Sequence, residues 1–415
     1  MTANISPFPI NGNIIAPPSK SVAMRYILLA ALCSSETIIE NTGNSEDVQT
    51  AIKCINALGA KIERRGNSLI INGATEYPDT AEFDFGECGF LLRSVLPVAH
   101  ALGIGFRYTM GGNLPNRPLK PLFDCLKSTL SENNGVYCGK MVAGEYMVDG
   151  TVSSQFVSGL LIAATAIDGE TTIKISGENV SVGYIDMTVS ALAVFGVKTE
   201  RISDGIKVFG GHISTPAKLK VEGDYSSAAY FLTLGALGDG ITVKGLNPYS
   251  KQPDKAIIDI LKEYGASVGF LSDGVTVSGG AIRNPLSVNI RNCPDLAPII
   301  AIAAAYAYGV SVIGGTDRLK IKESDRLNGI VDLLNSSGVS CEKGDNEIIV
   351  RGGNPKGIIY TGDKDHRMVM AAAILATTAD GKSRIYGAES VAKSYPAFFD
   401  DLCKVGGLNH VRISR

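Results

Sequence analysis

Apolar and polar positions along the chain follow one order that recurs six times. Each copy reads as an apolar helix, a glycine, a strand, a second helix, a second glycine, a strand, a turn and a strand. The second half of the copy is clearest in residues 51–73, 189–211, 258–280 and 331–353, with weaker copies at 122–150 and 398–414. The glycines expected to end the second helices lie about 70 residues apart, too long a period for the common solenoids, at Gly59, Gly135, Gly196, Gly265, Gly338 and Gly406. The pattern predicts six α/β units of one kind.

Length and composition limit what these units can form. The 415 residues exceed the size at which a single hydrophobic core stops growing, so we expect two domains of three units. The net charge of -2 provides no basic surface for nucleic acid. No apolar stretch reaches the roughly 18 residues of a membrane span, and the first residues lack a signal-peptide pattern, so we expect a cytoplasmic protein. The eight cysteines form no C-x-x-C pair and are expected to be free and mostly buried, without a metal.

The first helix of each copy is apolar almost all round, which is typical of a helix buried inside a domain. Its start is more polar in every copy, at Ser19, Cys88, Ser153, Asp224, Asp295 and Asp365. Ser and Asp are ordinary N-caps, but Lys20, Arg25 and Arg93 are poorly placed against the helix dipole. An anion at these starts would offset the cations, because unpaired N–H groups there bind phosphate or carboxylate. If the buried helices of both domains aim their starts at one interface, they form a cleft for a multiply charged substrate.

Two further segments carry groups suited to proton transfer. In residues 320–327, Lys322 and Arg326 are four apart and can share one anion if the segment is helical, while Glu323 is a candidate proton carrier. The same pattern also suits an ordinary surface helix with salt bridges. Asp295 precedes a buried helix and is interpreted either as its N-cap or as a general base.

Taken together, these residues resemble the 5-enolpyruvylshikimate-3-phosphate synthases. The resemblance runs in order along nearly the whole chain and is much more specific than any one of its segments. Its motifs are Pro18-Ser19-Lys20-Ser21 with Arg25, residues 152–156, Glu222-Gly223-Asp224, Pro294-Asp295, residues 322–326, Asp365-His366-Arg367, and Lys393. It implies transfer of the enolpyruvyl group of phosphoenolpyruvate to the 5-hydroxyl of shikimate 3-phosphate, with release of phosphate. It also implies two domains of three βαβαββ units that close on the substrates.

The resemblance assigns the site residues by position. The implied shikimate 3-phosphate site consists of Lys20, Ser21, Arg25, Ser153, Ser154, Gln155, Ser181, Asp295 and Lys322. The implied phosphoenolpyruvate site consists of Lys20, Gly89, Arg117, Gln155, Arg326, Arg367 and Lys393. In the implied mechanism Asp295, helped by Lys20, accepts the hydroxyl proton while Glu323 protonates the methylene carbon. No cofactor or metal is implied, since the cations stabilise the charge that develops on the phosphate.

One segment departs from the family. Where a Gly-Asn-Ala-Gly-Thr run is usual, this chain has Gly86-Glu87-Cys88-Gly89-Phe90, and Ser94 stands where proline is frequent. We expect a carboxylate and a bulky ring beside the phosphoenolpyruvate pocket, so neither affinity for that substrate nor sensitivity to glyphosate follows from the resemblance.

Two alternatives remain at this point. A UDP-N-acetylglucosamine enolpyruvyl transferase typically has Lys-Asn where this chain has Lys20-Ser21, and a cysteine in the loop that corresponds to residues 110–118, which has none here. A noncatalytic repeat protein that binds phosphorylated metabolites would need the cations but has no evident need for both Asp295 and Glu323.

The repeat also predicts the domain boundaries. Residues 19–223 are expected to form one domain, and residues 1–18 with 224–415 the other. The first residues are expected to return to the second domain as a strand. The two crossings near Pro18 and Gly223 would then form a hinge for closure on the substrates. A monomer is the default expectation.

Overall fold

The chain folds into two compact units, each with its own hydrophobic core. The computed structural model describes residues 1–178, 181–362 and 365–414. The first unit comprises Met1–Pro17 and Glu222–Arg415, and the second comprises Pro18–Val221. The chain therefore crosses between the two units at 17/18 and 221/222. The repeat in the sequence predicts these crossings at 18/19 and 223/224. One core is built from residues 3–16 and 225–411, and the other from residues 23–221.

Within the described ranges each unit contains three four-stranded sheets of one topology. Two parallel strands lie beside two antiparallel strands. In four of these six sheets a helix connects the parallel pair directly, as such crossovers require. In the second unit, the strands of one sheet are, in spatial order, β14 (Lys218–Lys220), β3 (Glu36–Glu40), β5 (Ser68–Asn72) and β4 (Lys61–Arg65). Those of the next sheet are β6 (Thr80–Asp84), β7 (Gly105–Thr109), β9 (Val136–Gly139) and β8 (Leu130–Asn133). Those of the third sheet are β10 (Glu145–Asp149), β11 (Gly169–Ser176), β13 (Gly205–Gly210) and β12 (Lys198–Ile202). This fold of repeated α/β units confirms the predicted class.

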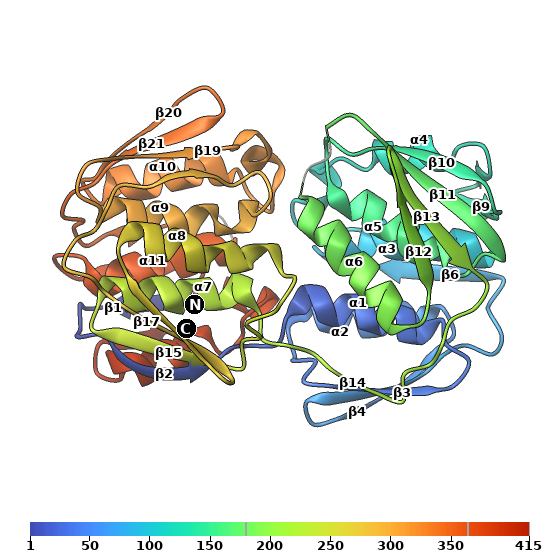
Figure 1. Ribbon diagram of the computed structural model, residues 1–415, viewed down its shortest axis with the longest axis horizontal. Coiled ribbons are helices and arrows are strands. Elements are labelled where there is room, and N and C mark those ends of the chain that lie inside the picture. Colours follow the sequence, from blue (N-terminus) through green and yellow to red (C-terminus); the bar gives the residue numbers. More distant parts are fainter. Residues whose placement is uncertain (179–180, 363–364, 415) are drawn as a thin grey trace. The chain divides into compact units, whose positions relative to one another are not determined.

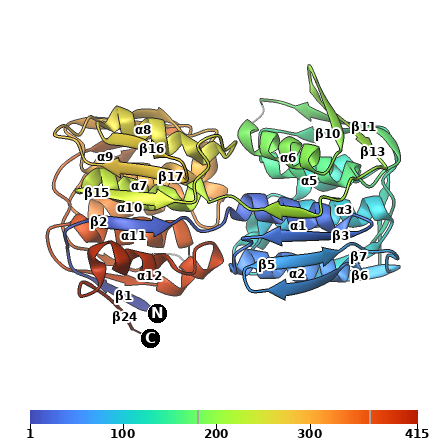
Figure 2. The same ribbon diagram turned by 60° about the horizontal axis from the view of Figure 1, so that its bottom comes forward.

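The first unit repeats the same order with strands taken from both ends of the chain (Figure 2). The strands of its first sheet are β2 (Asn11–Ile15), β15 (Gly240–Lys244), β17 (Gly274–Ser278) and β16 (Ser267–Leu271). Those of its second sheet are β18 (Ser287–Asn289), β19 (Val310–Gly314), β21 (Glu347–Arg351) and β20 (Ser340–Lys343). Those of its third sheet are β22 (Ile359–Tyr360), β23 (Ser383–Tyr386), β1 (Thr2–Ile5) and β24 (Val411–Ser414). Strand β1 pairs with both β23 and β24, so it supplies the last strand of the sixth copy. In the sequence this strand therefore lies far from the other strands of the sixth copy. Residues 1–18 thus contribute two strands to this unit.

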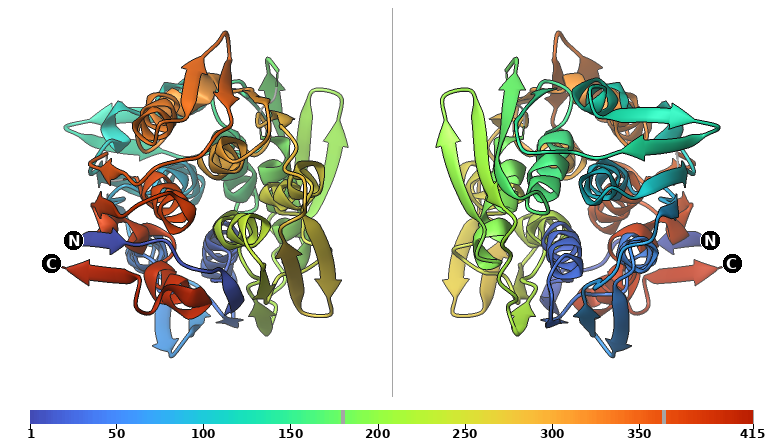
Figure 3. Two further views of the ribbon diagram at one scale, coloured as in Figure 1. Left: turned by 90° about the vertical axis from the view of Figure 1, so that its left-hand side faces the viewer. Right: turned by 90° about the vertical axis from the view of Figure 1, so that its right-hand side faces the viewer.

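The first helix of each copy lies inside its unit (Figure 1). These helices are α1 (Lys20–Ala31), α3 (Gly89–Leu102), α5 (Ser154–Ala164), α7 (Tyr225–Leu237), α9 (Ala297–Ala305) and α11 (His366–Thr378). Every residue of α7 and α9 is buried, which agrees with sequences that are apolar all round. In the end-on views of Figure 3 the sheets of each unit lie outside its helices. No helix of the described residues is long and apolar enough to cross a membrane.

The second helices vary more in length. They are α2 (Glu46–Ala57), α4 (Lys120–Leu126), α6 (Val182–Val194), α8 (Ile257–Tyr264), α10 (Arg326–Ser336) and α12 (Phe398–Leu402). Short helical turns η1 (Leu114–Asn116), η2 (Pro253–Ala256), η3 (Pro294–Leu296), η4 (Asp317–Ile321), η5 (Ala388–Lys393) and η6 (Cys403–Gly407) link the longer elements.

The prediction that a glycine ends the second helix fits most copies but was wrong in one. Gly265, with φ of 103°, is the left-handed C-cap of α8, as a helix-ending glycine should be. Gly135 does not follow a helix, because α4 already ends at Leu126. Together with Asn134 it forms the tight turn between β8 and β9, with φ of 50° and 75° at the two residues. The Asn-Gly pair is a typical hairpin turn of this kind.

Helices α3 and α5 approach each other closely at Gly159. A Cβ atom at this position would clash with the carbonyl oxygen of Arg93 on α3. A glycine inside a helix costs stability relative to alanine, so its presence here is explained by the close approach. The backbone that carries Arg93 is therefore fixed directly against α5.

Gly159→Ala should lower the free energy of unfolding by about 1–3 kcal/mol, because α3 and α5 must move apart. Gly329→Ala in α10 is the matched control, since its Cβ would meet Met368 at an ordinary contact distance of 3.4 Å. The control should gain about 0.5–1 kcal/mol. Urea unfolding of both variants tests this, and a Gly159→Ala protein as stable as the wild type would show that the helices are not in forced contact.

Candidate functional site

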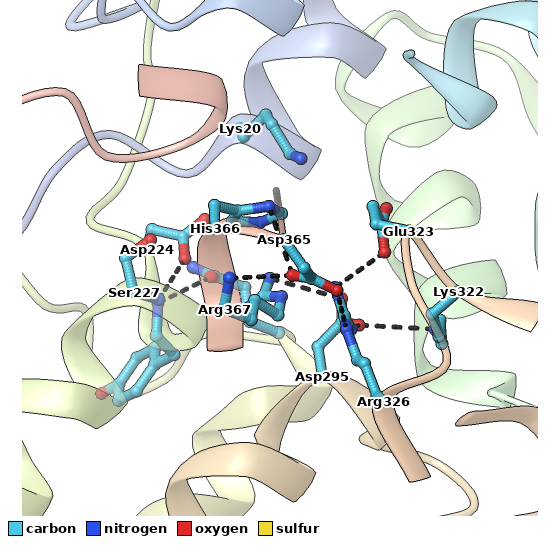
Figure 4. A network of polar contacts seen from close by, with 12 residues as sticks. Lys20, Asp224, Ser227, Asp295, Lys322, Glu323, Arg326, Asp365, His366 and Arg367 are labelled. Carbon is cyan, nitrogen blue, oxygen red and sulfur yellow. Dashed lines mark hydrogen bonds and ion pairs between the residues drawn. The ribbon is translucent and has the colours of Figure 1, made fainter. Parts of the chain in front are cut away.

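The buried guanidinium of Arg326 lies at the centre of a charged cluster in the first unit (Figure 4). Its Nε donates to Asp365 at 2.8 Å, its Nη1 to Asp295 at 2.7 Å, and its Nη2 to Glu323 at 2.7 Å. Arg326 and Asp365 are fully buried, whereas the side chains of Glu323 and Asp295 are 17% and 23% exposed. One cation therefore holds three carboxylates, two of which reach the surface of the unit.

Asp295 is surrounded by cations. Besides Arg326, Lys322 Nζ lies 3.4 Å from its Oδ1, and Arg367 Nη2 lies 3.3 Å from its Oδ2. Burial opposes ionisation, but the charges of Arg367, Lys322 and Arg326 hold the pKa of Asp295 well below its usual range. The carboxylate is therefore ionised and able to accept a proton once the cations are drawn elsewhere.

The N-cap interpretation of Asp295 was wrong. The residue lies in η3, and the N-cap of α9 is Leu296. The proline at position 294 begins a short turn in front of the helix, so the carboxylate is carried away from the helix start. It accepts hydrogen bonds from cationic side chains instead.

The segment 320–327 is not one helix, which corrects the spacing argument for Lys322 and Arg326. Turn η4 ends at Ile321, the backbone of Lys322 is extended, and α10 begins at Arg326. The two cations nevertheless share one anion, because both contact Oδ1 of Asp295. The bend in the chain, rather than helical periodicity, brings them together.

Arg367 occupies the first turn of α11. The N-cap carboxylate of Asp365 accepts from its backbone N–H at 2.9 Å. Burial acts against the charge, but Asp295 raises the pKa of the Arg367 guanidinium above its ordinary value. Its Nη1 is buried with no hydrogen-bond acceptor among the described residues. Lys393, the last residue of η5, is also buried, and η5 packs against α11.

Asp254 was not singled out from the sequence. It is 2% exposed, lies in η2 and is close enough to Asp295 and Arg367 for their charges to act on it. Burial raises the pKa of Asp254 to about 6, and the charge of Asp295 acts in the same direction. In the sequence, Asp254 is an acidic residue after Pro253, a pattern that is common at the start of a turn. This pattern does not indicate that Asp254 lies near Asp295 and Arg367.

Lys20 of the second unit is paired with a carboxylate. Its Nζ donates to Asp47 Oδ2 at 2.7 Å, and Asp47 lies in the first turn of α2, after the N-cap Ser45. An acidic residue is ordinary in that position, so Asp47 could not be assigned to the site from sequence alone. Ser21 follows Lys20 and is partly buried.

Arg25 lies deeper in α1, and its hydrogen-bond acceptors among the described residues are all neutral. Nε donates to Thr188 Oγ1 at 2.9 Å, and Nη1 to the carbonyl of Ser21 at 2.8 Å. Nη2 donates to the carbonyl of Tyr184 at 3.1 Å and lies 3.5 Å from Ser158 Oγ. Burial lowers the pKa of Arg25 to about 10. A buried cation without a counter-charge favours binding of an anion.

A second cationic group surrounds Gly89 at the start of α3. Arg93 Nη1 donates to Gln155 Oε1 at 2.7 Å, and Nη2 to the carbonyl of Pro118 at 2.7 Å. A Cβ at Gly89 would lie 2.6 Å from Arg93 Nη1 and 2.9 Å from Arg117 Nη1. Gly89, Arg117 and Gln155, all assigned to the implied phosphoenolpyruvate site, are therefore neighbours in the second unit. Arg93 belongs to the same group, although the sequence indicated only that it lies near a helix start.

The three serines lie at the starts of two neighbouring helices. Ser153 is the N-cap of α5, with Oγ accepting from the N–H of Gln155 at 3.3 Å, and Ser154 begins the helix. Ser181 is the N-cap of α6 and has a left-handed backbone, with φ of 55°. Non-glycine residues adopt this conformation rarely, and it is concentrated at functional sites.

Segment 86–90 differs from the usual family sequence, and its two unusual side chains, Glu87 and Phe90, lie in different surroundings. Glu87 is exposed and leans over Gly112, where a Cβ would clash with its carboxylate. Phe90 is 6% exposed, and its ring lies against the guanidinium of Arg25. The ring therefore contacts a residue assigned to the shikimate 3-phosphate site.

The predicted residues fall into two groups, one in each unit. The second unit carries Lys20, Ser21, Arg25, Gly89, Arg117, Ser153, Ser154, Gln155 and Ser181, and the first unit carries Asp295, Lys322, Glu323, Arg326, Arg367 and Lys393. The hydroxyls and helix starts suit phosphate and hydroxyl groups, whereas the first unit holds the candidate proton carriers among cations.

Comparisons with known proteins agree on one family. The family described as EPSP synthase (3-phosphoshikimate 1-carboxyvinyltransferase) matches residues 6–402. The 3-phosphoshikimate 1-carboxyvinyltransferases of Clostridium kluyveri and Methanocorpusculum labreanum are 36% and 35% identical, over 97% and 96% of both chains in each pair.

Solved structures share the fold. EPSP synthase from Acinetobacter baumannii has a TM-score of 0.83 at 23% identity, with all of both chains covered. The enolpyruvyl transferase NikO from Streptomyces tendae has a TM-score of 0.76 at 16% identity, covering 98% of this chain and 97% of that one. By its sequence match over nearly its whole length, the chain belongs to the EPSP synthase family, the 3-phosphoshikimate 1-carboxyvinyltransferases.

Proposed function

We propose that the chain carries out the reaction of its family through the residues of both units described above. It transfers the enolpyruvyl group of phosphoenolpyruvate to the 5-hydroxyl of shikimate 3-phosphate and releases phosphate, a step of aromatic amino acid biosynthesis. The family match supports this reaction over transfer to UDP-N-acetylglucosamine. The observation that carries the residue roles is the sharing of Arg326 by Asp295 and Glu323. A protein that only binds phosphometabolites has no need for two carboxylates at one buried cation.

The proposed addition step uses these two carboxylates in opposite roles. Asp295, helped by Lys20, accepts the proton of the 5-hydroxyl as its oxygen bonds to the second carbon of phosphoenolpyruvate. Glu323 donates a proton to the methylene carbon, which becomes a methyl group in a tetrahedral intermediate. Loss of a proton from that methyl group then restores the double bond and expels phosphate. Arg326, Arg367 and Lys393 stabilise the charge on the departing phosphate.

Substrate anions are what change the protonation of the two carboxylates. In the structure Asp295 is contacted by Lys322, Arg326 and Arg367, which keep its pKa low. When phosphate and carboxylate groups of the substrates bind these cations, their hold on Asp295 and Glu323 weakens, and both carboxylates gain affinity for protons. Asp295 then becomes an effective base and Glu323 can carry the proton that it donates.

The remaining roles concern substrate binding. Lys20, Ser21, Arg25, Ser153, Ser154, Gln155, Ser181, Asp295 and Lys322 are proposed to bind shikimate 3-phosphate, and Lys20, Gly89, Arg117, Gln155, Arg326, Arg367 and Lys393 to bind phosphoenolpyruvate. Because these sets draw on both units, we propose that the units act as domains that close on the two substrates, with helix starts directed toward them. A monomer in the cytoplasm, without nucleic-acid or membrane partners, remains our expectation.

The wild-type protein should release inorganic phosphate from phosphoenolpyruvate only when shikimate 3-phosphate is also present. A colorimetric phosphate assay, with mass spectrometry of the enolpyruvyl product, measures this directly. UDP-N-acetylglucosamine serves as the control acceptor and should give no phosphate. Binding of both substrates without turnover would overturn the proposal in favour of a binding protein.

Glu323→Gln should lower kcat by about 100-fold or more, because an amide cannot donate the proton to the methylene carbon. The dissociation constant for shikimate 3-phosphate should change by less than about threefold, since glutamine keeps the size of the side chain and Glu323 is not among the residues proposed to bind that substrate. Steady-state kinetics and calorimetric titration give the two quantities. Turnover at the wild-type rate would remove Glu323 from the role of proton donor.

A further inference from the structure

The burial of Arg25 poses an electrostatic problem. Its side chain is 2% exposed, and its described partners are a threonine hydroxyl, a serine hydroxyl and two backbone carbonyls. No carboxylate of the described residues pairs with it, and burial lowers the pKa of Arg25 to about 10. Burying a charge without such a partner is costly, so another source of stabilisation is required.

The ring of Phe90 contacts this guanidinium. The Cζ atom of Arg25 lies over the ring, 4.6 Å from its centroid. A guanidinium within about 6 Å of an aromatic face is attracted by the negative charge of the π system, most strongly where both groups are desolvated. Phe90 is 6% exposed and is held in the first turn of α3, so it presents its face from a fixed position.

The neighbouring helix repeats the arrangement. Arg93 of α3 lies over Phe156 of α5, with 5.1 Å between Cζ and the ring centroid, and its described hydrogen bonds go to the Gln155 amide oxygen and to carbonyls. Each of these arginines is thus supported by a ring from the start of the next first helix. Two independent contacts of one kind indicate a shared way of holding a cation in this unit.

We propose that Phe90 is a positioning residue for shikimate 3-phosphate: its ring holds Arg25 charged and aligned toward an anionic group of that substrate without a competing carboxylate. A carboxylate in the place of the ring would have to be displaced when the substrate binds. The ring stabilises the guanidinium but leaves it available, because the ring stacks on the face of the planar group whereas a substrate anion hydrogen-bonds to N–H groups at its edge. The inference rests on the proposed function only in that Arg25 contacts shikimate 3-phosphate.

The first unit shows the opposite arrangement. There Arg326 is bound to Asp295, Glu323 and Asp365, and Arg367 to Asp295. In that group the carboxylates are needed for proton transfer, so the competition between them and the substrate is part of the reaction. Around Arg25 no proton has to move. A neutral ring therefore serves where binding alone is required.

Phe90→Leu tests the proposal, because it removes the ring and keeps an apolar side chain. The dissociation constant for shikimate 3-phosphate, and its KM, should rise by about threefold to thirtyfold, the range expected for loss of a buried cation–π contact. The KM for phosphoenolpyruvate should change by less than about twofold. Phe90→Tyr, which keeps the ring, should restore most of the affinity.

Phe83→Leu is the matched control for loss of a ring. Phe83 is 2% exposed in β6 and stacks on Phe85, away from any described cation contact. Both leucine variants should show similar losses of melting temperature, but only Phe90→Leu should bind shikimate 3-phosphate more weakly. Equal affinity of Phe90→Leu and the wild type would overturn the proposal.

A double-mutant cycle separates this inference from the proposed function. In an Arg25→Gln background, Phe90→Leu should change the dissociation constant by less than about twofold, because the cation that the ring supports is absent. The full effect of Phe90→Leu persisting in that background would show that the ring acts by packing alone and would overturn the inference. Absence of any shikimate 3-phosphate binding by the wild type would instead refute the proposed function.

Discussion

The interaction on which the site depends is the contact of one buried guanidinium with three carboxylates. Arg326 begins α10, and its partners come from three other places in the chain: Asp295 in η3, Glu323 after η4 and Asp365 at the N-cap of α11. Removal of one partner from a buried charged group commonly costs about 3–5 kcal/mol, because an uncompensated charge remains. The guanidinium therefore fixes the candidate base and the candidate acid relative to each other.

Arg326 in the first unit and Arg25 in the second are held by different means, and the difference follows their proposed tasks. In the first unit carboxylates surround the cations, so an arriving anion changes the charges that decide where protons reside. In the second unit Arg25 is held by hydroxyls, carbonyls and an aromatic ring, whereas Lys20 is paired with Asp47. Asp254, with a pKa of about 6, adds a further carboxyl to the first group that can gain or lose a proton near neutrality.

Much of the fold follows from local sequence signals, whereas the site depends on contacts that such signals do not contain. The apolar first helices and the helix-ending Gly265 could be predicted because burial and a left-handed cap each demand particular residues. Gly135 was misassigned because an Asn-Gly turn and a helix end both favour glycine. The sharing of Asp295 by Lys322 and Arg326 arises from a bend rather than from helical spacing. Asp47 and Asp254 gave no signal, since acidic residues at a helix or turn start are common.

The central claim is that Arg326 keeps Glu323 ionised until substrate anions weaken its hold and allow a proton to bind. The protonation of Glu323 can be followed by infrared difference spectroscopy of its carboxyl group, with Glu323→Gln as the reference, first without substrates and then in the equilibrium mixture of bound substrates and products. Our account predicts an ionised carboxylate in the protein alone and a protonated carboxyl band when the ligands are bound. A Glu323 carboxylate that stays fully ionised with the ligands bound would contradict it.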